Sequence, residues 1–343
     1  MPRKIFTAYR SKVRRISPMN KFQISVLVLI FHLAVVTSRA QQAPIATAET
    51  SPGSVIEVIR RTAGFIGVTY RDGADEKQTI GTCFFVSVPD ARVPDGKVFI
   101  YLVTNRHVAA PGIDLGQNHQ PTNTIVRLNL VSPQGAAESE QFALGSNLHW
   151  YFPQDESVDL AVLPLGPDPG KYAYMQIPVA LLVSADQVKA GDVVVGDRLV
   201  FAGYFSNFPG QKRIEPIIRE GVVAMLPDET LDTTLHKPGQ IYLGDLHAFH
   251  GNSGSPVFVN VNSAAHHGQI TLGEKYLLLG VLSGYFPESV GFSVPAAQVL
   301  TGEVRDNSGI ATIVPADKLN RLLNSSELKA QRDEAVALLP KKP

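Results

Sequence analysis

The sequence has very little cysteine: Cys83 is the single thiol in 343 residues. One cysteine excludes an intrachain disulfide framework and any zinc module built on cysteine pairs. Because Thr82 and Phe84 flank it, we expect Cys83 to be a small buried hydrophobe. Charged residues are also scarce, at 18% against 44% hydrophobic residues. This balance excludes a disordered polyelectrolyte and indicates a chain that can bury a large core.

Beyond residue 40, the chain has fewer basic than acidic residues. Of the 31 Lys and Arg residues, eight lie within residues 1–40, where no acidic residue occurs, so the remainder holds 23 basic against 31 acidic residues. A net charge of about −8 does not suit a phosphate backbone, so nucleic acid is not an expected partner. The sequence also lacks a dinucleotide fingerprint and a glycine loop that would cradle phosphates, and no cofactor is predicted.

Long hydrophobic runs are limited to Phe22–Val36, a stretch of 15 residues that follows a basic segment. This stretch is short for a spanning helix, which needs roughly 20 apolar residues. Small residues follow it, so residues 1–40 are predicted to be a secretory signal peptide and residues 41–53 a linker. Export with one cysteine indicates a periplasmic or extracellular protein. An uncleaved segment that anchors the protein in the membrane is the alternative.

Helical periodicity is missing before residue 315, and short runs rich in β-branched and aromatic residues recur instead. Two successive all-β units are therefore predicted. The end of the chain differs, because Leu319, Leu322 and Leu323 share one face of a predicted helix, and a second helix is predicted after Asn324, with Asn324 and Glu327 as its capping signal. The runs expected to form strands are residues 64–70, 81–88, 98–103, 124–130, 160–165, 193–195, 198–204, 214–225, 240–243, 257–261, 276–282 and 311–314.

Three short strings carry residues suited to nucleophilic catalysis. His107 follows Thr-Asn-Arg, Asp159 begins Asp-Leu-Ala-Val, and Ser253 lies in Gly-Asn-Ser-Gly-Ser-Pro. A serine hydroxyl becomes a useful nucleophile when an imidazole takes its proton, and a carboxylate orients that imidazole. Asp155 and Glu156 are competing carboxylates, for which solvated loop positions are predicted.

These strings, in the order His, Asp, Ser, resemble the chymotrypsin-like or trypsin-like serine peptidases. The resemblance covers most of the chain, and the string that begins Gly81-Thr82-Cys83 is similar to an early strand of that family. The serine string is close to that of bacterial secreted members such as the glutamyl endopeptidases. The resemblance implies an all-β, chymotrypsin-like fold of two antiparallel six-stranded β-barrels with a C-terminal helix. It also implies a catalytic triad of His107, Asp159 and Ser253.

Further residues follow from the same resemblance. The backbone N–H groups of Gly251 and Ser253 would form the oxyanion hole, since glycine reaches the backbone angles that this turn needs. Digestive members carry an aspartate before the serine, which receives a newly cut amino terminus. Asn252 occupies that place here, which argues against this mode of activation.

Substrate-binding positions are predicted at His247, Ser283 and Gly284. The last two would offer backbone pairing to an extended peptide. Trypsins that cut after Lys or Arg have an acidic residue where this chain has His247, so a cationic preference is not expected. The histidine pairs His247 with His250 and His266 with His267 lack a third ligand, and no metal site is predicted.

The sequence therefore predicts a secreted or periplasmic serine endopeptidase that acts on polypeptides through an acyl-enzyme. The alternatives are a non-enzymatic peptide-binding protein on a peptidase fold and an esterase that uses the same triad. Residues 54–170 are expected to form the barrel with His107 and Asp159, residues 171–314 the barrel with Ser253, and residues 315–343 a helical segment.

Overall fold

The computed structural model describes residues 54–117, 119–131, 138–261, 274–294 and 300–339. The predicted signal segment and linker, residues 1–53, lie outside the described residues, and so do His266 and His267. Within the described ranges, none of the helices has the length and apolar character needed to cross a bilayer.

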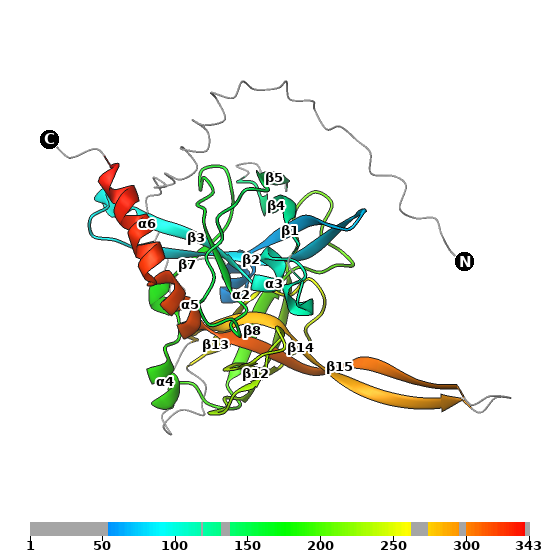
Figure 1. Cartoon of the computed structure of the whole chain (residues 1–343). Helices are drawn as coiled ribbons and strands as arrows, with labels where there is room; N and C mark the ends of the chain where they lie inside the picture. Colours follow the sequence, from blue (N-terminus) through cyan, green and yellow to red (C-terminus); the bar gives the residue numbers. More distant parts are fainter. Residues whose placement is uncertain (1–53, 118, 132–137, 262–273, 295–299, 340–343) are drawn as a thin grey trace. The chain divides into compact units, whose positions relative to one another are not determined.

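The first half of the described chain forms a seven-stranded sheet (Figure 1). Its order is β5-β4-β1-β2-β3-β6, and β7 pairs with β2 in parallel. The strands are β1 (Ala63–Asp72), β2 (Asp75–Pro89), β3 (Val98–Thr104), β4 (Pro121–Asn129), β5 (Ser139–Gly145), β6 (Ala161–Pro164) and β7 (Gln176–Pro178).

The second half forms a closed six-stranded barrel in the order β12-β15-β14-β13-β8-β9. Together with the first sheet, it confirms the predicted all-β class. The barrel strands are β8 (Arg198–Gly203), β9 (Ile217–Met225), β12 (Tyr242–Asp245), β13 (Pro256–Asn260), β14 (Tyr276–Val294) and β15 (Leu300–Pro315). Two short strands, β10 (Leu231–Asp232) and β11 (Pro238–Gly239), pair outside the barrel.

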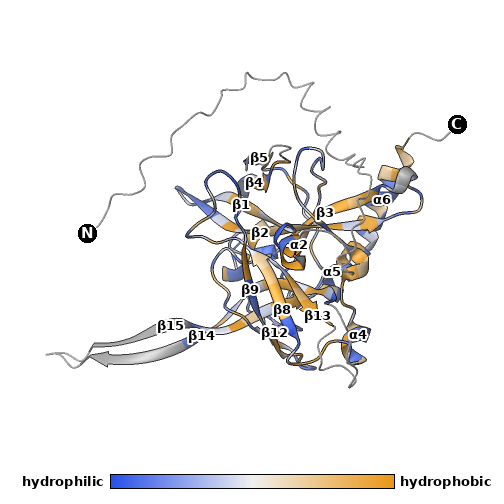
Figure 2. Ribbon diagram, turned by 180° about the vertical axis from the view of Figure 1, so that it is seen from behind, coloured by the Kyte–Doolittle hydropathy of each residue, from blue (hydrophilic) through white to orange (hydrophobic). Residues whose placement is uncertain are grey.

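Burial follows the strand patterns that the sequence shows. In β4, Thr124, Val126 and Leu128 are buried while the residues between them are half-buried, as expected for a strand with one face on the core. In β13 all five residues are buried, which matches its continuous apolar run. Figure 2 shows the hydrophobic residues concentrated in the central strands.

Several predicted strand boundaries were wrong. Residues 193–195 form a turn, because Gly191 and Gly196 take positive φ angles and Asp197 accepts a hydrogen bond from the Val194 N–H at 2.8 Å. The strand predicted over residues 276–282 continues as β14 to Val294. It pairs there with an equally extended β15, so that the two form a ribbon beyond the barrel (Figure 1). Strands β5 and β7 were not predicted.

The C-terminal helices are α5 (Ala316–Leu323) and α6 (Ser326–Ala337), as predicted in type and place. The cap of α6 differs from the prediction: Ser325, not Asn324, accepts the N–H of Leu328. Short helices that the sequence did not predict are α2 (Val55–Arg60), α3 (Arg106–Ala109) and α4 (Ala185–Lys189), together with the 3₁₀ turns Pro94–Gly96, Ile113–Leu115 and Val179–Leu181.

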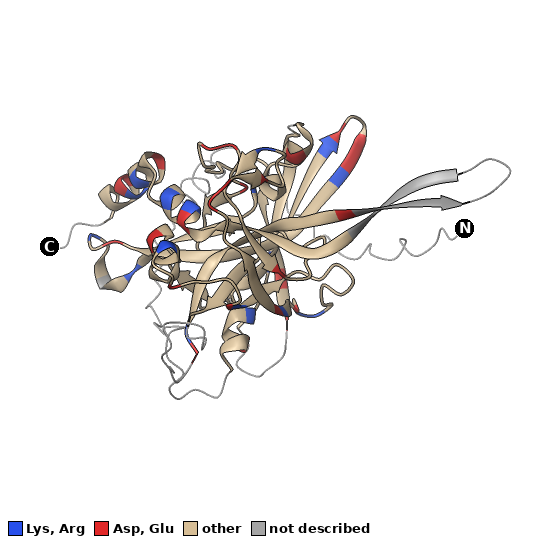
Figure 3. Cartoon of the chain, turned by 90° about the horizontal axis from the view of Figure 1, so that it is seen from below, with Lys and Arg blue, Asp and Glu red and all other residues tan. Residues whose placement is uncertain are grey.

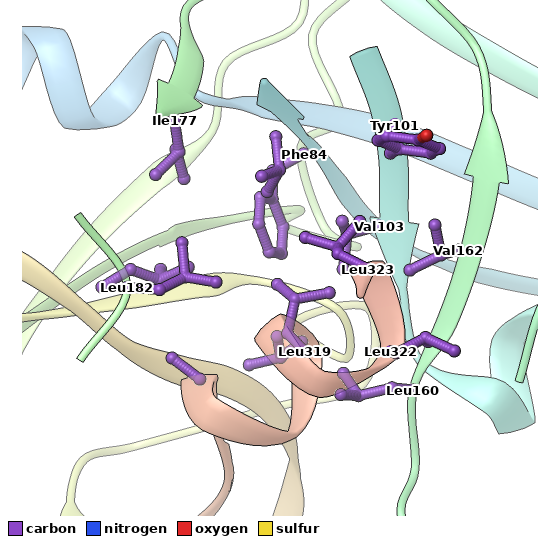
Figure 4. Packing of buried hydrophobic residues seen from close by; sticks show 14 of the residues in the cluster. Phe84, Tyr101, Val103, Leu160, Val162, Ile177, Leu182, Leu319, Leu322 and Leu323 are labelled. Carbon is purple, nitrogen blue, oxygen red and sulfur yellow. The ribbon is translucent and has the colours of Figure 1, made fainter. Parts of the chain in front are cut away.

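Helix α5 lies within the core that both halves share (Figure 4). Leu319 and Leu323 are fully buried and belong to one cluster with Phe84 and Val103 of the first sheet and with Phe258 of the barrel. Burial of each leucine stabilises the fold by about 1.5 to 3 kcal/mol. The helix therefore fixes the two sheets against each other.

A Leu319→Ala variant should lower the free energy of unfolding by about 2 to 5 kcal/mol, because the substitution leaves a cavity in this cluster. Leu338→Ala is the matched control, since Leu338 is 59% exposed and should change stability by less than about 0.5 kcal/mol. Urea unfolding of both variants measures the difference. Equal stabilities would contradict the position assigned to α5.

Figure 3 shows that basic and acidic residues are interspersed along the chain. One group joins distant segments: Arg92 contacts Asp90 at 2.6 Å and Asp333 of α6 at 2.7 Å. Exposed pairs of this kind contribute about 0 to 1 kcal/mol each, so the apolar core, rather than the surface charge, supports the fold.

Candidate active site

Strand pairing brings His107 and Asp159 together. Thr104, the last residue of β3, pairs with Ala161, the first residue of β6. His107 lies in α3, directly after β3, and Asp159 lies just before β6, so antiparallel pairing puts both at the same end of the sheet. The Asn105 side-chain amide reinforces this junction by donating to the Asp159 backbone carbonyl at 2.8 Å.

The two side chains form a close pair. His107 Nδ1 lies 2.7 Å from Asp159 Oδ2, and the His107 backbone N–H donates to Oδ1 at 3.0 Å. The Asp159 side chain is 1% exposed and the His107 side chain 16%. Burial alone would disfavour both charges, but their mutual attraction and hydrogen bonds outweigh it. The pKa of His107 is therefore raised above its ordinary value and that of Asp159 is lowered.

Ser253 comes from the second half of the chain, on the turn that precedes β13. It is half-buried and lines the same cleft as His107, a space of about 840 Å³ between the first sheet and the barrel. In this structure the Ser253 hydroxyl donates to the Ser283 carbonyl at 3.4 Å. The cleft thus holds the imidazole and the hydroxyl that the sequence assigned to one site.

Glycine is required on both sides of Ser253. Gly251 has φ +93°, and a Cβ there would lie 2.4 Å from Tyr204. Gly254 has φ +87°, and a Cβ there would lie 2.1 Å from the Thr82 carbonyl oxygen. Both contacts exclude a side chain, so the turn needs glycine for its angles and for its close packing.

Thr82 of β2 holds this turn from the first half of the chain. Its N–H donates to the Ser253 carbonyl at 2.8 Å, and its hydroxyl donates to the Gly251 carbonyl at 2.9 Å. The same hydroxyl accepts the Tyr204 N–H at 2.9 Å. Thr82 lies in the string that begins Gly81-Thr82-Cys83, but the sequence alone does not predict this contact.

Asn252 fixes the turn from inside. Its Oδ1 accepts the Phe249 N–H at 2.9 Å and its Nδ2 donates to the Tyr204 carbonyl at 2.6 Å, while the residue is 1% exposed. Both polar groups of the Asn252 side chain are therefore bonded to backbone groups, and neither of these bonds involves the amino terminus of the chain.

Within the described residues, the N–H groups of Gly251 and Ser253 donate to no acceptor. Two such free donors in one turn can bind an oxyanion.

The predicted substrate-binding residues have different positions. Ser283 and Gly284 line the cleft as part of β14. The Ser283 side chain is buried and its hydroxyl bonds the Thr312 hydroxyl at 3.0 Å, so its backbone faces the cleft. His247 is exposed, packs beside Gly309 and is not among the residues that line the cleft. The structure therefore does not bring His247 to the site.

The competing carboxylates, Asp155 and Glu156, form contacts in the loop before Asp159, and no hydrogen bond joins either of them to His107 in the described part of the chain. Asp155 accepts the N–H and the hydroxyl of Ser157, at 3.0 and 2.7 Å, and Glu156 forms an ion pair with Lys237. A further contact was not predicted: Thr234 donates its hydroxyl to Asp159 Oδ2 at 2.9 Å. Among the described residues, no group of three or more His, Cys, Asp or Glu side chains is arranged to hold a metal ion.

Comparison with known proteins gives one family match. A family model described as a trypsin-like peptidase domain matches residues 81–263, a segment that contains His107, Asp159 and Ser253. A search of curated proteins found no match.

Three solved structures are similar to the chain at low identity. Deg5 is 18% identical, with 78% of this chain and 88% of that chain covered and a TM-score of 0.42. An HtrA-type protease, AlgW with a decapeptide, is 14% identical, with 82% and 67% covered and a TM-score of 0.43. The active form of the Rv3671c protease from M. tuberculosis is 16% identical, with 84% and 93% covered and a TM-score of 0.42.

Proposed function

The chain belongs to the trypsin-like peptidase family, and from that premise we propose that it is a serine endopeptidase that cuts polypeptides through an acyl-enzyme. The observation that carries the proposal is the His107–Asp159 pair at 2.7 Å, of which His107 lines one cleft together with Ser253. A buried carboxylate that fixes one nitrogen of an imidazole leaves the other nitrogen free to accept a proton.

Each residue has one task in the proposed reaction. Ser253 Oγ attacks the scissile carbonyl carbon while His107 accepts the hydroxyl proton, and the resulting imidazolium is stabilised by Asp159. The N–H groups of Gly251 and Ser253 stabilise the oxyanion. His107 then gives its proton to the leaving amine as the peptide bond breaks. Water, activated by the same imidazole, hydrolyses the ester on Ser253 and restores the hydroxyl.

The backbone of β14 is proposed to align the substrate. Past Leu282, the edge of β14 at Ser283 and Gly284 lines the cleft, where an extended peptide can pair with it as an added strand. This mode uses main-chain groups and so accepts many sequences. The Gly-Asn-Ser-Gly-Ser-Pro string supports a place among the bacterial secreted enzymes.

The basic and apolar segment within residues 1–40 supports export to the periplasm or the exterior. Cell fractionation followed by amino-terminal sequencing tests this proposal. A protein that starts near residue 41 in the periplasm or medium supports it, and a full-length protein in the cytoplasm overturns it.

Turnover of unfolded casein tests the proposed activity. The wild-type chain should release new peptide termini, and His107→Ala should abolish the release. Hydrolysis of a small ester without casein cleavage would indicate an esterase instead. Tight binding of casein with no new termini in the wild type would indicate a peptide-binding protein.

The activity should depend on pH through His107. Because His107 must be neutral to accept the serine proton, kcat/KM should fall as the pH drops through its pKa. That pKa is raised above 6.5 by Asp159, so the acid limb should have its midpoint above pH 6.5. Measurement of kcat/KM on a peptide from about pH 5 to 9 gives the midpoint. A midpoint below 6.5 would contradict the coupling of His107 to Asp159.

A further inference from the structure

The short sheet of β10 and β11 carries a loop toward the carboxylate of the candidate site. Thr234 lies on this loop, and its hydroxyl donates to Asp159 Oδ2 at 2.9 Å. Thr234 is 75 residues from Asp159 in sequence and comes after β9 of the barrel, whereas Asp159 precedes β6 of the first sheet. The contact therefore joins the two halves of the molecule at the triad.

Among the described residues, three hydrogen bonds reach the Asp159 carboxylate. Oδ1 accepts the His107 backbone N–H, and Oδ2 accepts both His107 Nδ1 and the Thr234 hydroxyl. Thr234 is thus the one side chain besides His107 that donates to this carboxylate in the described part of the chain. Two other hydroxyls near the site have different partners: Ser253 donates to the Ser283 carbonyl, and Ser283 bonds Thr312.

The loop that carries Thr234 is fixed against the segment before Asp159. Lys237 forms an ion pair with Glu156, and a Cβ on Gly239 would lie 2.6 Å from the Ser157 hydroxyl. Within the loop, the Thr233 N–H donates to the Lys237 carbonyl at 3.0 Å. These contacts hold the loop independently of the Thr234 hydroxyl.

Thr234 also contacts the edge strand proposed to bind peptide. Its methyl group lies against Gly284, where an added Cβ would be 2.7 Å from Thr234 Cγ2. One side chain therefore meets the carboxylate with its hydroxyl and the substrate-binding strand with its methyl group.

We propose that Thr234 is a positioning residue for the His107–Asp159 pair: its hydroxyl fixes the orientation of the carboxylate. The consequence for catalysis rests on the proposed function. A buried carboxylate with one donor fewer can rotate, and His107 then loses the orientation that proton transfer from Ser253 requires.

The Thr234 hydroxyl also has an electrostatic effect on the pKa of His107. It stabilises the Asp159 charge most strongly when His107 is neutral, because the imidazolium otherwise compensates that charge. Removal of the hydroxyl should therefore raise the pKa of His107. Asp159 and Asp114 are the charged groups that act on His107, and the histidines that line the same cleft are His119, His236 and His250.

Two substitutions at Thr234 test the proposal. Thr234→Val keeps the shape but removes the donor, and kcat should fall by a factor of about 10 to 100. The acid limb of kcat/KM should move to higher pH. Thr234→Ser keeps the hydroxyl and should restore both kcat and the limb. A Thr234→Val variant with wild-type kcat and an unmoved limb would overturn the proposal.

Thr233→Val is the structural comparator. In the described part of the chain, the Thr233 hydroxyl accepts the Leu235 N–H at 3.3 Å and has no hydrogen bond to His107, Asp159 or Ser253. This variant should lower the melting temperature without moving the acid limb. If it moves the limb as far as Thr234→Val does, loop stability rather than the Asp159 contact is responsible, and the proposal fails.

A measurement without turnover separates this proposal from the proposed function. In a Ser253→Ala background, NMR titration gives the pKa of His107 directly. Addition of Thr234→Val should raise that pKa, and addition of Thr234→Ser should leave it unchanged. An unchanged pKa in the valine variant overturns the positioning role even if casein is cleaved. A raised pKa supports the role even if casein is not cleaved.

Discussion

A Ser253→Ala variant should hydrolyse peptides about 10⁶-fold more slowly than the wild-type chain. The substitution removes the oxygen that forms the acyl-enzyme, while the His107–Asp159 pair and the N–H groups of the turn stay in place. The remaining rate should come from binding and oxyanion stabilisation alone, and it should still exceed that of the uncatalysed reaction. Initial rates on a fluorogenic peptide library measure the loss.

Ser255→Ala is the matched control in the same turn. The Ser255 hydroxyl is buried and has no hydrogen-bond partner among the described residues, so its removal should leave the activity near the wild-type level. Loss of activity in the control as large as that in Ser253→Ala would show that the substitutions disturb the turn, and would contradict a specific role for Ser253.

An Asp159→Asn variant should lower kcat by about 10⁴-fold. The asparagine keeps the size of the side chain, but an amide placed at Oδ2 would present N–H groups to His107 Nδ1. The ring would then carry its proton on the nitrogen that should accept the serine proton. The Thr234 hydroxyl would also lose a charged acceptor. Steady-state kinetics, corrected for active sites, measures the effect.

The control for this variant is Glu156→Gln. Glu156 is a neighbouring carboxylate whose side chain is 68% exposed and paired with Lys237, so neutralising it should change kcat less than about threefold. Equal effects of the two amide substitutions would mean that the loop as a whole, and not the carboxylate beside His107, supports the activity.

Local sequence patterns predicted much of the fold. Runs with β-branched and aromatic residues marked strands such as β3 and β8, and the leucine spacing marked α5. The prediction failed where a non-local partner decides the structure. β7 is three residues long and exists because Phe85 and its neighbours in β2 pair with it. The turn at residues 193–195 is apolar, but Gly196 and Asp197 end any strand there.

In the candidate site, too, the residues that lie in local sequence strings were predicted, and the residue whose role depends on a distant contact was not. His107, Asp159 and Ser253 lie in short strings whose residue order is informative, so the sequence alone could assign them to one site. Thr234 has no such string, because its role depends on a loop that crosses from the other half of the chain. His247 was assigned by its distance from Ser253 in sequence, and it lies exposed beside Gly309 rather than among the residues that line the cleft.

Covalent labelling shows whether Ser253 is the activated nucleophile of this cleft. A fluorophosphonate should form one adduct per folded chain, and mass spectrometry of the digest should place it on Ser253. Urea-unfolded protein and the His107→Ala variant should label far more slowly. An adduct on another residue, or equal labelling of Ser253→Ala, would contradict the assignment of this cleft as a serine peptidase site.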